Sequence, residues 1–405
     1  HTPAEIRTIR NERNLKPVYK VVDTCAGEFT AETPYSYSTY ESTHDIQPLN
    51  GPKVMILGGG PNRIGQGIEF DYCCVQAVYG LREAGFKSIM VNCNPETVST
   101  DFDLADRLYF EPITFEDIMN IIEFEKPDGV LVQFGGQTPL KIAEQLTKEG
   151  VKILGTSSAS IDLAENREEF ARIIKKLKIQ IPEYCIAKNY DEIINFSEVA
   201  QFPVLVRPSY VLGGRAMQIV YNKEQLVDYV FRSAEATNDH PILIDQFIEN
   251  AFEFDVDALC DGKEVFIAGI MQHIEEAGVH SGDSSCVIPP YDMSDKIKKD
   301  IIDMTTKLAL ELNVIGLINL QFAVKGNEAY VLEVNPRSSR TVPFVSKYSN
   351  VPLANIAAQL SVGKKLKDFN LEENNFNHIA VKKAVLPFKK FKNEKVFLGP
   401  EMKST

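Results

Sequence analysis

Short buried strands alternate with amphipathic helices between residues 52 and 155. Apolar runs typical of strands that are covered on both faces occur at 53–57, 88–92, 129–133 and 151–155. Apolar side chains at helical spacing follow at 68–81, 118–124 and 139–146. This alternation predicts a small doubly wound parallel sheet of the α/β class.

The flanking segments have other patterns. Residues 1–50 predict a short helix over 5–14 and an irregular run over 30–43, which would be a linker or a surface strap. Helix is expected over 160–177 and extended chain from 183. Strands dominate beyond residue 203, with helices over 224–236 and 295–312, so this part is expected to be α+β.

The strongest local prediction is a β-hairpin with strands over 317–324 and 328–335. If paired positions sum to 652 or 654, Gln321 faces position 331 or 333. It then shares one sheet face with Glu333 and Asn335. The opposite face would pack a core with Leu320, Phe322, Leu332 and Val334.

Gln321, Glu333 and Asn335 all carry oxygen donors, the ligand type that Mg²⁺ prefers. Arg337 and Arg340 follow this strand, where a planar guanidinium can hold a phosphate or a carboxylate. A merely solvated polar face is the alternative, because half-exposed antiparallel sheets are common. The apolar runs around these residues favour the metal site.

A glycine-rich turn from Gly58 to Gly67 ends a strand and opens a helix, where backbone N–H groups could meet a phosphate. It matches neither common fingerprint. A dinucleotide-binding turn needs glycine where Arg63 stands, and a P-loop needs Lys and Ser or Thr where Gln66 and Gly67 stand. A tight strand-to-helix turn is therefore the alternative. Residues 134–138 could line the same crevice.

Composition narrows the function classes. The net charge of −13 argues against a nucleic-acid partner, which would require clustered basic residues. No apolar stretch approaches the ~20 residues that span a bilayer, so no membrane partner is expected. Seven cysteines without metal-ligand spacing indicate reduced thiols and a cytoplasmic protein. The first residue is not Met, and we expect a piece of a longer polypeptide.

Two long motifs, at 205–217 and 333–341, resemble signatures of the ATP-grasp superfamily. More narrowly, they resemble the carbamoyl phosphate synthetase large subunit in its C-terminal, carbamate-phosphorylating half. Segments 58–67, 92–101, 278–284 and 398–405 fit the same half. The resemblance implies four parts: the tail of an oligomerisation domain and a linker at 1–45, a Rossmann-like pre-ATP-grasp domain at 46–160, an ATP-grasp domain at 161–385, and a truncated C-terminal segment at 386–405.

The implied activity is that of a ligase that phosphorylates carbamate with ATP. This is the last step in making carbamoyl phosphate from bicarbonate, glutamine-derived ammonia and two ATP. The implied cofactors are ATP and Mg²⁺ or Mn²⁺, with K⁺ as a further candidate ion. The implied partners are the N-terminal half of the same subunit and a glutaminase small subunit, within an oligomer. The choice between arginine and pyrimidine synthesis stays open.

The resemblance also assigns site residues. Arg167 and Arg207 would contact phosphate, Glu253 would hold the ribose, and Arg337 and Arg340 would address carbamate and its phosphorylated product. Metal ions would be held by the three hairpin residues Gln321, Glu333 and Asn335. The nucleotide-binding set as a whole would be Arg167, Arg207, Gln246, Ile248, Glu253, Gly278, Val279, His280, Ser281, Gln321 and Glu333. A structural role is the alternative for His280.

Three other functions compete with this interpretation. The first is another ATP-grasp ligase, such as a biotin carboxylase or a purine-pathway carboxylate–amine ligase. The second is a nicotinamide-dependent dehydrogenase built on 52–155, which the missing third glycine disfavours. The third is an interaction module without catalytic activity.

Overall fold

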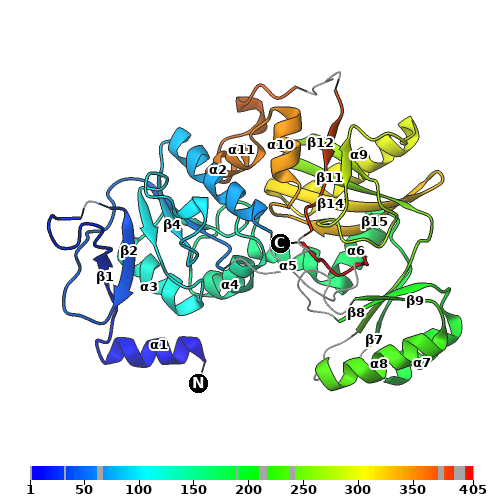
Figure 1. The fold of residues 1–405 in the computed structure, drawn as a ribbon, viewed down its shortest axis with the longest axis horizontal. Coiled ribbons are helices and arrows are strands. Elements are labelled where there is room, and N and C mark those ends of the chain that lie inside the picture. The colour runs from blue at the N-terminus through cyan, green and yellow to red at the C-terminus, as the bar shows by residue number, and fades with distance from the viewer. Residues whose placement is uncertain are drawn as a thin grey trace.

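The chain is described by a computed structural model over residues 2–31, 33–61, 67–187, 190–208, 217–237, 242–372, 378–386 and 397–404. The side chains of 190, 191, 208 and 231–237 lie outside this description. Figure 1 shows an N-terminal α/β body beside a larger body that is built on two antiparallel sheets. No helix in these ranges is long and apolar enough to cross a membrane.

The N-terminal body has a doubly wound sheet of strand order β1-β2-β5-β4-β3-β6. Alternate side chains of β3 (Lys53–Leu57) point to opposite faces. Val54 and Ile56 pack against α2, whereas Met55 and Leu57 pack with α3 and α4. The parallel strands and their helices are β4 (Lys87–Val91), β5 (Arg107–Tyr109), β6 (Gly129–Leu131), α2 (Glu69–Glu83), α3 (Phe115–Glu125) and α4 (Gln137–Lys148).

Two sequence predictions for this sheet are wrong in part. The run 30–43 is not irregular throughout, because Tyr35–Thr39 forms β2, which pairs in parallel with β5. Its Ser, Tyr and Thr side chains carry no apolar alternation, so the strand depends on its neighbour for pairing. The expected strand at 151–155 is only a bridge between Val130 and Ile153. The remaining N-terminal elements are α1 (Pro3–Glu12), β1 (Val18–Val21) and the short helix η1 (Val98–Thr100).

The helical prediction over 160–177 is interrupted at Asn166. Two helices, α5 (Ser158–Glu165) and α6 (Arg167–Leu177), meet there, and the Asn166 side chain accepts from the backbone N–H groups of residues 168 and 169. This cap restarts the helix and directs Arg167 from its first turn. After β7 (Tyr184–Ala187) the chain forms α7 (Tyr190–Val199), so the extended prediction from 183 is wrong for that stretch.

A small antiparallel sheet of order β7-β10-β8-β9 follows, covered by α7 and α8. Its apolar core includes Ile193 from α7 and Leu226 and Tyr229 from α8. Figure 1 places this layer below the large sheet, across from the N-terminal body. The new elements are β8 (Val204–Pro208), β9 (Gln218–Val220), α8 (Lys223–Thr237) and β10 (Ile242–Gln246).

The large sheet has the order β15-β14-β11-β12-β13-β16 and is covered on both faces. Helix α9 packs one face through Ile301 and Leu308, and α10 and α11 pack the other through Val345 and Leu353. Helix α11 also packs on α2 and so joins the two bodies. The elements are β11 (Phe252–Asp261), β12 (Val265–His273), β13 (Cys286–Ile288), α9 (Asp295–Glu311), β14 (Ile315–Lys325), β15 (Glu328–Asn335), α10 (Val342–Ser349), α11 (Leu353–Ser361), η2 (Leu366–Asp368) and β16 (Ala380–Lys382).

The β14–β15 hairpin forms as predicted, but its register is set by a two-residue turn and a bulge. Lys325 pairs with Glu328, and this register would place Gln321 opposite Leu332. A shift between Gln321 and Phe322 adds Leu332 as an extra residue, so that Gln321 instead faces Glu333. Leu332 therefore lines a cavity, and its predicted place in the core is wrong. The other predicted core residues, Leu320, Phe322 and Val334, are buried.

Candidate active site

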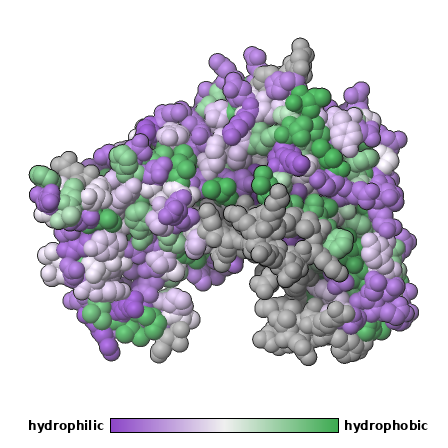
Figure 2. Space-filling view, in the orientation of Figure 1, coloured by the Kyte–Doolittle hydropathy of each residue, from purple (hydrophilic) through white to green (hydrophobic). Residues whose placement is uncertain are grey.

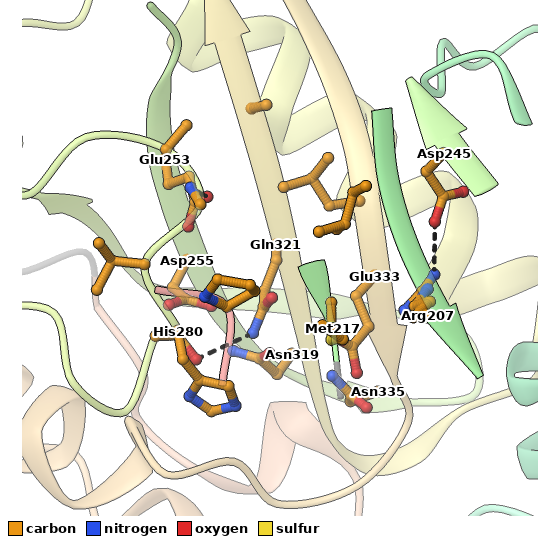
Figure 3. Close-up of a pocket in the computed structure, with 18 of the residues that line it drawn as sticks. Arg207, Met217, Asp245, Glu253, Asp255, His280, Asn319, Gln321, Glu333 and Asn335 are labelled. Carbon is orange, nitrogen blue, oxygen red and sulfur yellow. Dashed lines mark hydrogen bonds and ion pairs between the residues drawn. The ribbon is translucent and has the colours of Figure 1, made fainter. Parts of the chain in front are cut away.

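One cavity of about 310 Å³ lies where the small sheet, the large sheet and the N-terminal body meet. Every residue that the sequence analysis assigned to nucleotide, metal or carbamate lines it. Figure 3 shows the strands β14 and β15 directing Gln321, Glu333 and Asn335 into the same space. Residues that are far apart along the chain, from Arg167 to Arg340, are thus brought to one place.

The hairpin face gathers oxygen donors at the centre of the cavity. Gln321 lies opposite Glu333, and Asn319 lies opposite Asn335. Gln321 Nε2 donates to Ser281 Oγ over 3.4 Å, which leaves its carbonyl oxygen free to bind a cation. On the neighbouring strand, Asp255 pairs with Gln321 and keeps a buried Oδ1 that has no hydrogen-bond partner among the described residues.

This donor set fits Mg²⁺ or Mn²⁺ that is shared with a phosphate, not a closed protein site. Oxygen ligands suit these hard ions, which keep waters and substrate oxygens in their coordination. The described part of the chain contains no cluster of three or more His, Cys, Asp or Glu residues able to hold a metal. Glu333 is the one carboxylate in the predicted set, so a phosphate-bearing ligand would have to supply further negative charge.

Two arginines converge on a carboxylate that the sequence analysis missed. Asp245 Oδ2 lies 3.3 Å from Arg167 Nη2 and 3.1 Å from Arg207 Nη2. Burial raises the pKa of Asp245, and Arg207 opposes this rise. The shared carboxylate aligns both guanidinium groups along one wall of the cavity (Figure 3 shows the pair of Arg207 and Asp245). The only signal in the sequence was an acidic residue at the end of the apolar strand 242–244.

A buried histidine, His273, contacts the Glu253 carboxylate. His273 Nδ1 lies 3.3 Å from Glu253 Oε2, and His273 Nε2 lies 2.8 Å from Asp255 Oδ2. Burial disfavours the imidazolium, but these hydrogen bonds raise the pKa of His273 well above its usual value. A protonated His273 therefore bridges two carboxylates and fixes the orientation of Glu253. Glu253 Oε1 also accepts from Gly278 N over 2.9 Å.

The loop from Gly278 to Ser281 covers this part of the cavity. Gly278 has a φ of +100°, and a Cβ there would lie 2.9 Å from the ring of Phe247, so the position requires glycine. His280 Nδ1 accepts from Gly282 N over 3.0 Å, and burial and Arg340 lower the pKa of His280. His280 thus supports its own loop, as the structural alternative expects, and also lines the cavity.

The C-terminal residues dock on this loop. His280 N donates to Gly399 O over 2.8 Å, and Ser404 N donates to Asp283 Oδ1 over 2.9 Å. The stretch 397–404 therefore holds the loop from outside, and Pro400 reaches the cavity. The sequence analysis assigned this stretch no role in the site.

At the far end of the cavity, the loop after β15 carries both predicted carbamate-binding arginines. Arg337 donates to Ser338 O over 2.8 Å and to Asn335 Oδ1 over 2.9 Å. Its buried Nε has no hydrogen-bond partner among the described residues and is available to a substrate. Ser338 Oγ donates to Gln133 O over 2.8 Å, which ties the loop to the N-terminal body.

Asp257 anchors the same loop from the large sheet. Asn319 Nδ2 and Ser339 Oγ donate to Asp257 Oδ1 over 3.0 and 2.7 Å, and Thr341 Oγ1 donates to Oδ2. Burial raises the pKa of Asp257 to about 6, although these donors oppose the rise. Arg340 lies between the two anchored hydroxyl residues, so its backbone is fixed by a side chain that the sequence analysis did not single out.

We expect protonation of Asp257 to weaken the site below pH 6. The rate of the reaction that this site catalyses should fall as the pH falls through about 6, because a protonated Asp257 carboxyl cannot accept hydrogen bonds from all three donors. Asp257→Asn should lower the rate about tenfold at pH 8, as expected for a lost charged acceptor. The ratio of wild-type to variant rates, measured from pH 5 to 8 with the same substrates, should fall toward acid. A constant ratio would contradict this role.

The linked effect on stability has the opposite sign. The folded pKa of Asp257 lies above its ordinary value of 3.8, so the fold binds this proton more tightly than the unfolded chain does. The contribution of Asp257 to stability is therefore present below pH 3.8 and is lost as the pH rises to about 6. A loss of rate toward acid would then report the site and not this group's effect on folding.

The glycine-rich turn is only partly covered by the structure. Residues 62–66 lie outside the described ranges, as do 209–216 of the long motif. A Cβ on Gly58 would lie 2.7 Å from the Asn92 side chain, and one on Gly135 would lie 2.5 Å from Leu57 O. Both glycines permit close packing at the carboxyl ends of β3 and β6, which favours the tight-turn alternative.

Known protein families match most of the chain. Residues 50–163 match the family described as carbamoyl phosphate synthase preATP-grasp domain, and residues 166–369 match that described as carbamoyl-phosphate synthase L chain, ATP binding domain. The chain belongs to the carbamoyl phosphate synthase large-chain family. This confirms the resemblance, and it leaves the dehydrogenase alternative without support.

Curated relatives from this family align with the full length of the chain or nearly all of it. The carbamoyl phosphate synthase large chain of Archaeoglobus fulgidus is 60% identical over 405 residues, which are 100% of this chain and 38% of that protein. The large chain of Pasteurella multocida is 57% identical over 98% of this chain and 38% of that protein. The chain thus spans less than half the length of these relatives.

Solved structures share the fold at low identity. The biotin carboxylase domain of Hydrogenobacter thermophilus 2-oxoglutarate carboxylase, in complex with MgADP, ADP and bicarbonate, matches with a TM-score of 0.67 at 17% identity, covering 84% of this chain and 76% of that one. Phosphoribosylglycinamide synthetase from Anaerococcus prevotii matches with a TM-score of 0.58 at 18% identity, covering 83% and 81%. This chain therefore has a Rossmann-like domain followed by an ATP-grasp fold, as predicted.

Proposed function

We propose that this chain uses ATP and a divalent cation to phosphorylate carbamate, giving carbamoyl phosphate and ADP. The observation that carries the proposal is one cavity in which the Gln–Glu–Asn face of the hairpin lies between two groups of arginines. One group, Arg167 and Arg207, adjoins the small sheet. The other, Arg337 and Arg340, follows β15. The family to which the chain belongs supports the same reaction.

The cavity suits a nucleotide that lies along its length. Adenine would lie near the backbone of Gln246 and Ile248 at the end of β10, and the ribose near Glu253. Arg167 and Arg207 would hold phosphate oxygens, with Asp245 keeping them aligned. The loop 278–281 would cover the nucleotide and exclude water, which protects carbamate from hydrolysis.

Phosphoryl transfer requires placement and charge neutralisation more than a protein nucleophile. Carbamate itself carries the attacking oxygen, and Arg337 and Arg340 would orient it toward the γ-phosphate. Mg²⁺ or Mn²⁺ held by Gln321, Glu333 and Asn335 would neutralise charge that develops on the phosphate oxygens. The chain therefore needs no catalytic cysteine or serine for this step.

Further proposals concern the whole enzyme. In the family, bicarbonate, glutamine-derived ammonia and two ATP are the starting materials, so we propose the C-terminal half of the large subunit as the place of this chain. Its partners would then be the N-terminal half of that subunit and a glutaminase small subunit. K⁺ remains a candidate further ion.

The reverse reaction tests the function directly. The chain, incubated with ADP, Mg²⁺ and carbamoyl phosphate, should form ATP that a luciferase assay detects. ATP should not form when inorganic phosphate replaces carbamoyl phosphate or when EDTA removes the metal. Absence of ATP from a folded chain that binds ADP would count against carbamate phosphorylation and favour the non-catalytic alternative.

A further inference from the structure

One aromatic ring from the N-terminal body lies beside both arginines at the carbamate end of the cavity. The guanidinium carbons of Arg337 and Arg340 lie 5.8 and 5.7 Å from the ring centroid of Phe70. Phe70 is in the first turn of α2, is 7% exposed, and lines the cavity. Gly136 packs against the ring, since a Cβ there would lie 3.1 Å from Phe70 Cδ2.

Placing two buried, positively charged guanidinium groups close together is electrostatically unfavourable. Burial lowers the pKa of Arg337. Burial also lowers the pKa of Arg340, Glu69 opposes this, and the charge of Arg337 lowers it further. The acidic groups that act on this pair are Glu69, Glu165, Asp283 and Glu333. Each further carboxylate would hold the arginines in place but would compete with an anionic substrate for them.

An aromatic face attracts cations without adding a negative charge. Its quadrupole stabilises a guanidinium within about 6 Å, most strongly where water is excluded. We propose that Phe70 is a positioning residue that holds Arg337 and Arg340 toward carbamate and carbamoyl phosphate while keeping this end of the cavity electropositive. The inference rests on the proposed function, because it assigns the two arginines to that substrate.

The position of Phe70 gives the N-terminal body a part in the reaction. The ring comes from α2, whereas the arginines follow β15 of the large sheet. Ser338, next to Arg337, is bonded to Gln133 and Phe134 of the same N-terminal body. The arginine pair is therefore oriented only when the two bodies are packed together.

The sharpest test changes the electrons of the ring and not its shape. Phe70 in the full chain would be replaced by phenylalanine with one, two or three ring fluorines, which weaken the quadrupole stepwise. The values of kcat/KM for carbamoyl phosphate in the reverse reaction should fall stepwise, to about a twentieth at three fluorines. The KM for ADP should stay unchanged. Calorimetric titration with carbamoyl phosphate, without nucleotide, should show the same weakening.

Phe115 provides a matched control, because it is 8% exposed in the core around α3 and far from the arginines in sequence. The same fluorinated residues at position 115 should leave both constants unchanged. Equal rates across the Phe70 series, or a parallel rise in the KM for ADP, would overturn the inference and leave the proposed function intact. An unsubstituted chain that forms no ATP would overturn both.

Discussion

Glu333→Gln is expected to lower the rate of ATP formation from ADP and carbamoyl phosphate about a thousandfold, which corresponds to about 4 kcal/mol of transition-state stabilisation. Glu333 is the single carboxylate of the predicted metal set and lies opposite Gln321 across the bulged ladder. The substitution keeps the size of the side chain but removes the negative charge that holds a divalent cation. Because Glu333 is solvent-exposed, the fold should be unaffected.

The measurement combines the initial rate at several Mg²⁺ concentrations with thermal unfolding of the same sample. The variant should unfold at the wild-type temperature and require more Mg²⁺ for any residual activity. Glu328→Gln is the matched control, because Glu328 lies on the same strand at the hairpin turn, away from the cavity, and should keep the wild-type rate. A Glu333→Gln variant that retains a tenth of the rate would refute the metal assignment.

Gly80→Val should lower the free energy of unfolding more than any of the other substitutions proposed above. Gly80 lies in α2 where α11 crosses it, and a Cβ there would lie 2.3 Å from the backbone oxygen of Asn355. The same contact is fixed by Glu83, which accepts from Asn355 Nδ2 over 3.1 Å and from Gln359 Nε2 over 3.0 Å. A valine must push the helices apart and break these partly buried bonds, and we expect the free energy of unfolding to fall by about 3 kcal/mol or more.

Urea unfolding followed by circular dichroism measures this effect. Tyr79→Val is the control on the same helix, because Tyr79 is 40% exposed, and it should change the free energy of unfolding by less than about 1 kcal/mol. Since the α2–α11 contact joins the two bodies, surviving folded Gly80→Val protein should also show weaker carbamoyl phosphate binding. A Gly80→Val chain as stable as wild type would show that the helices are not tightly packed at this crossing.

The hairpin shows how far residue patterns carry a prediction. Strand periodicity placed Glu333 and Asn335 on one face, because side chains alternate along a strand. Gln321 joins them on that face only through the register shift in the ladder. The pairing itself depends on a two-residue turn and on the bulge at Leu332. A bulge depends on packing against neighbouring strands, and no residue pattern within the hairpin predicted it.

Residues whose partners lie far along the chain were the hardest to foresee. Phe70 reads as one more apolar residue of an amphipathic helix, and Asp257 as a polar residue within a strand. Their significance comes from partners 267 and 82 positions away, at Arg337 and Ser339. The same is true of β2, whose pairing with β5 supplies what its own sequence lacks. The resemblance to a family supplied Gln246, Ile248 and Glu253, which no spacing rule connects to the hairpin.

A crystal structure of the chain with ADP and Mn²⁺ tests the central claim most directly, because manganese can be located by its anomalous scattering. The account predicts a manganese peak within coordination distance of Gln321 and Glu333, with the ADP phosphates between it and the guanidinium groups of Arg167 and Arg207. A nucleotide bound in another cavity, or manganese bound away from the β14–β15 hairpin, would contradict the account.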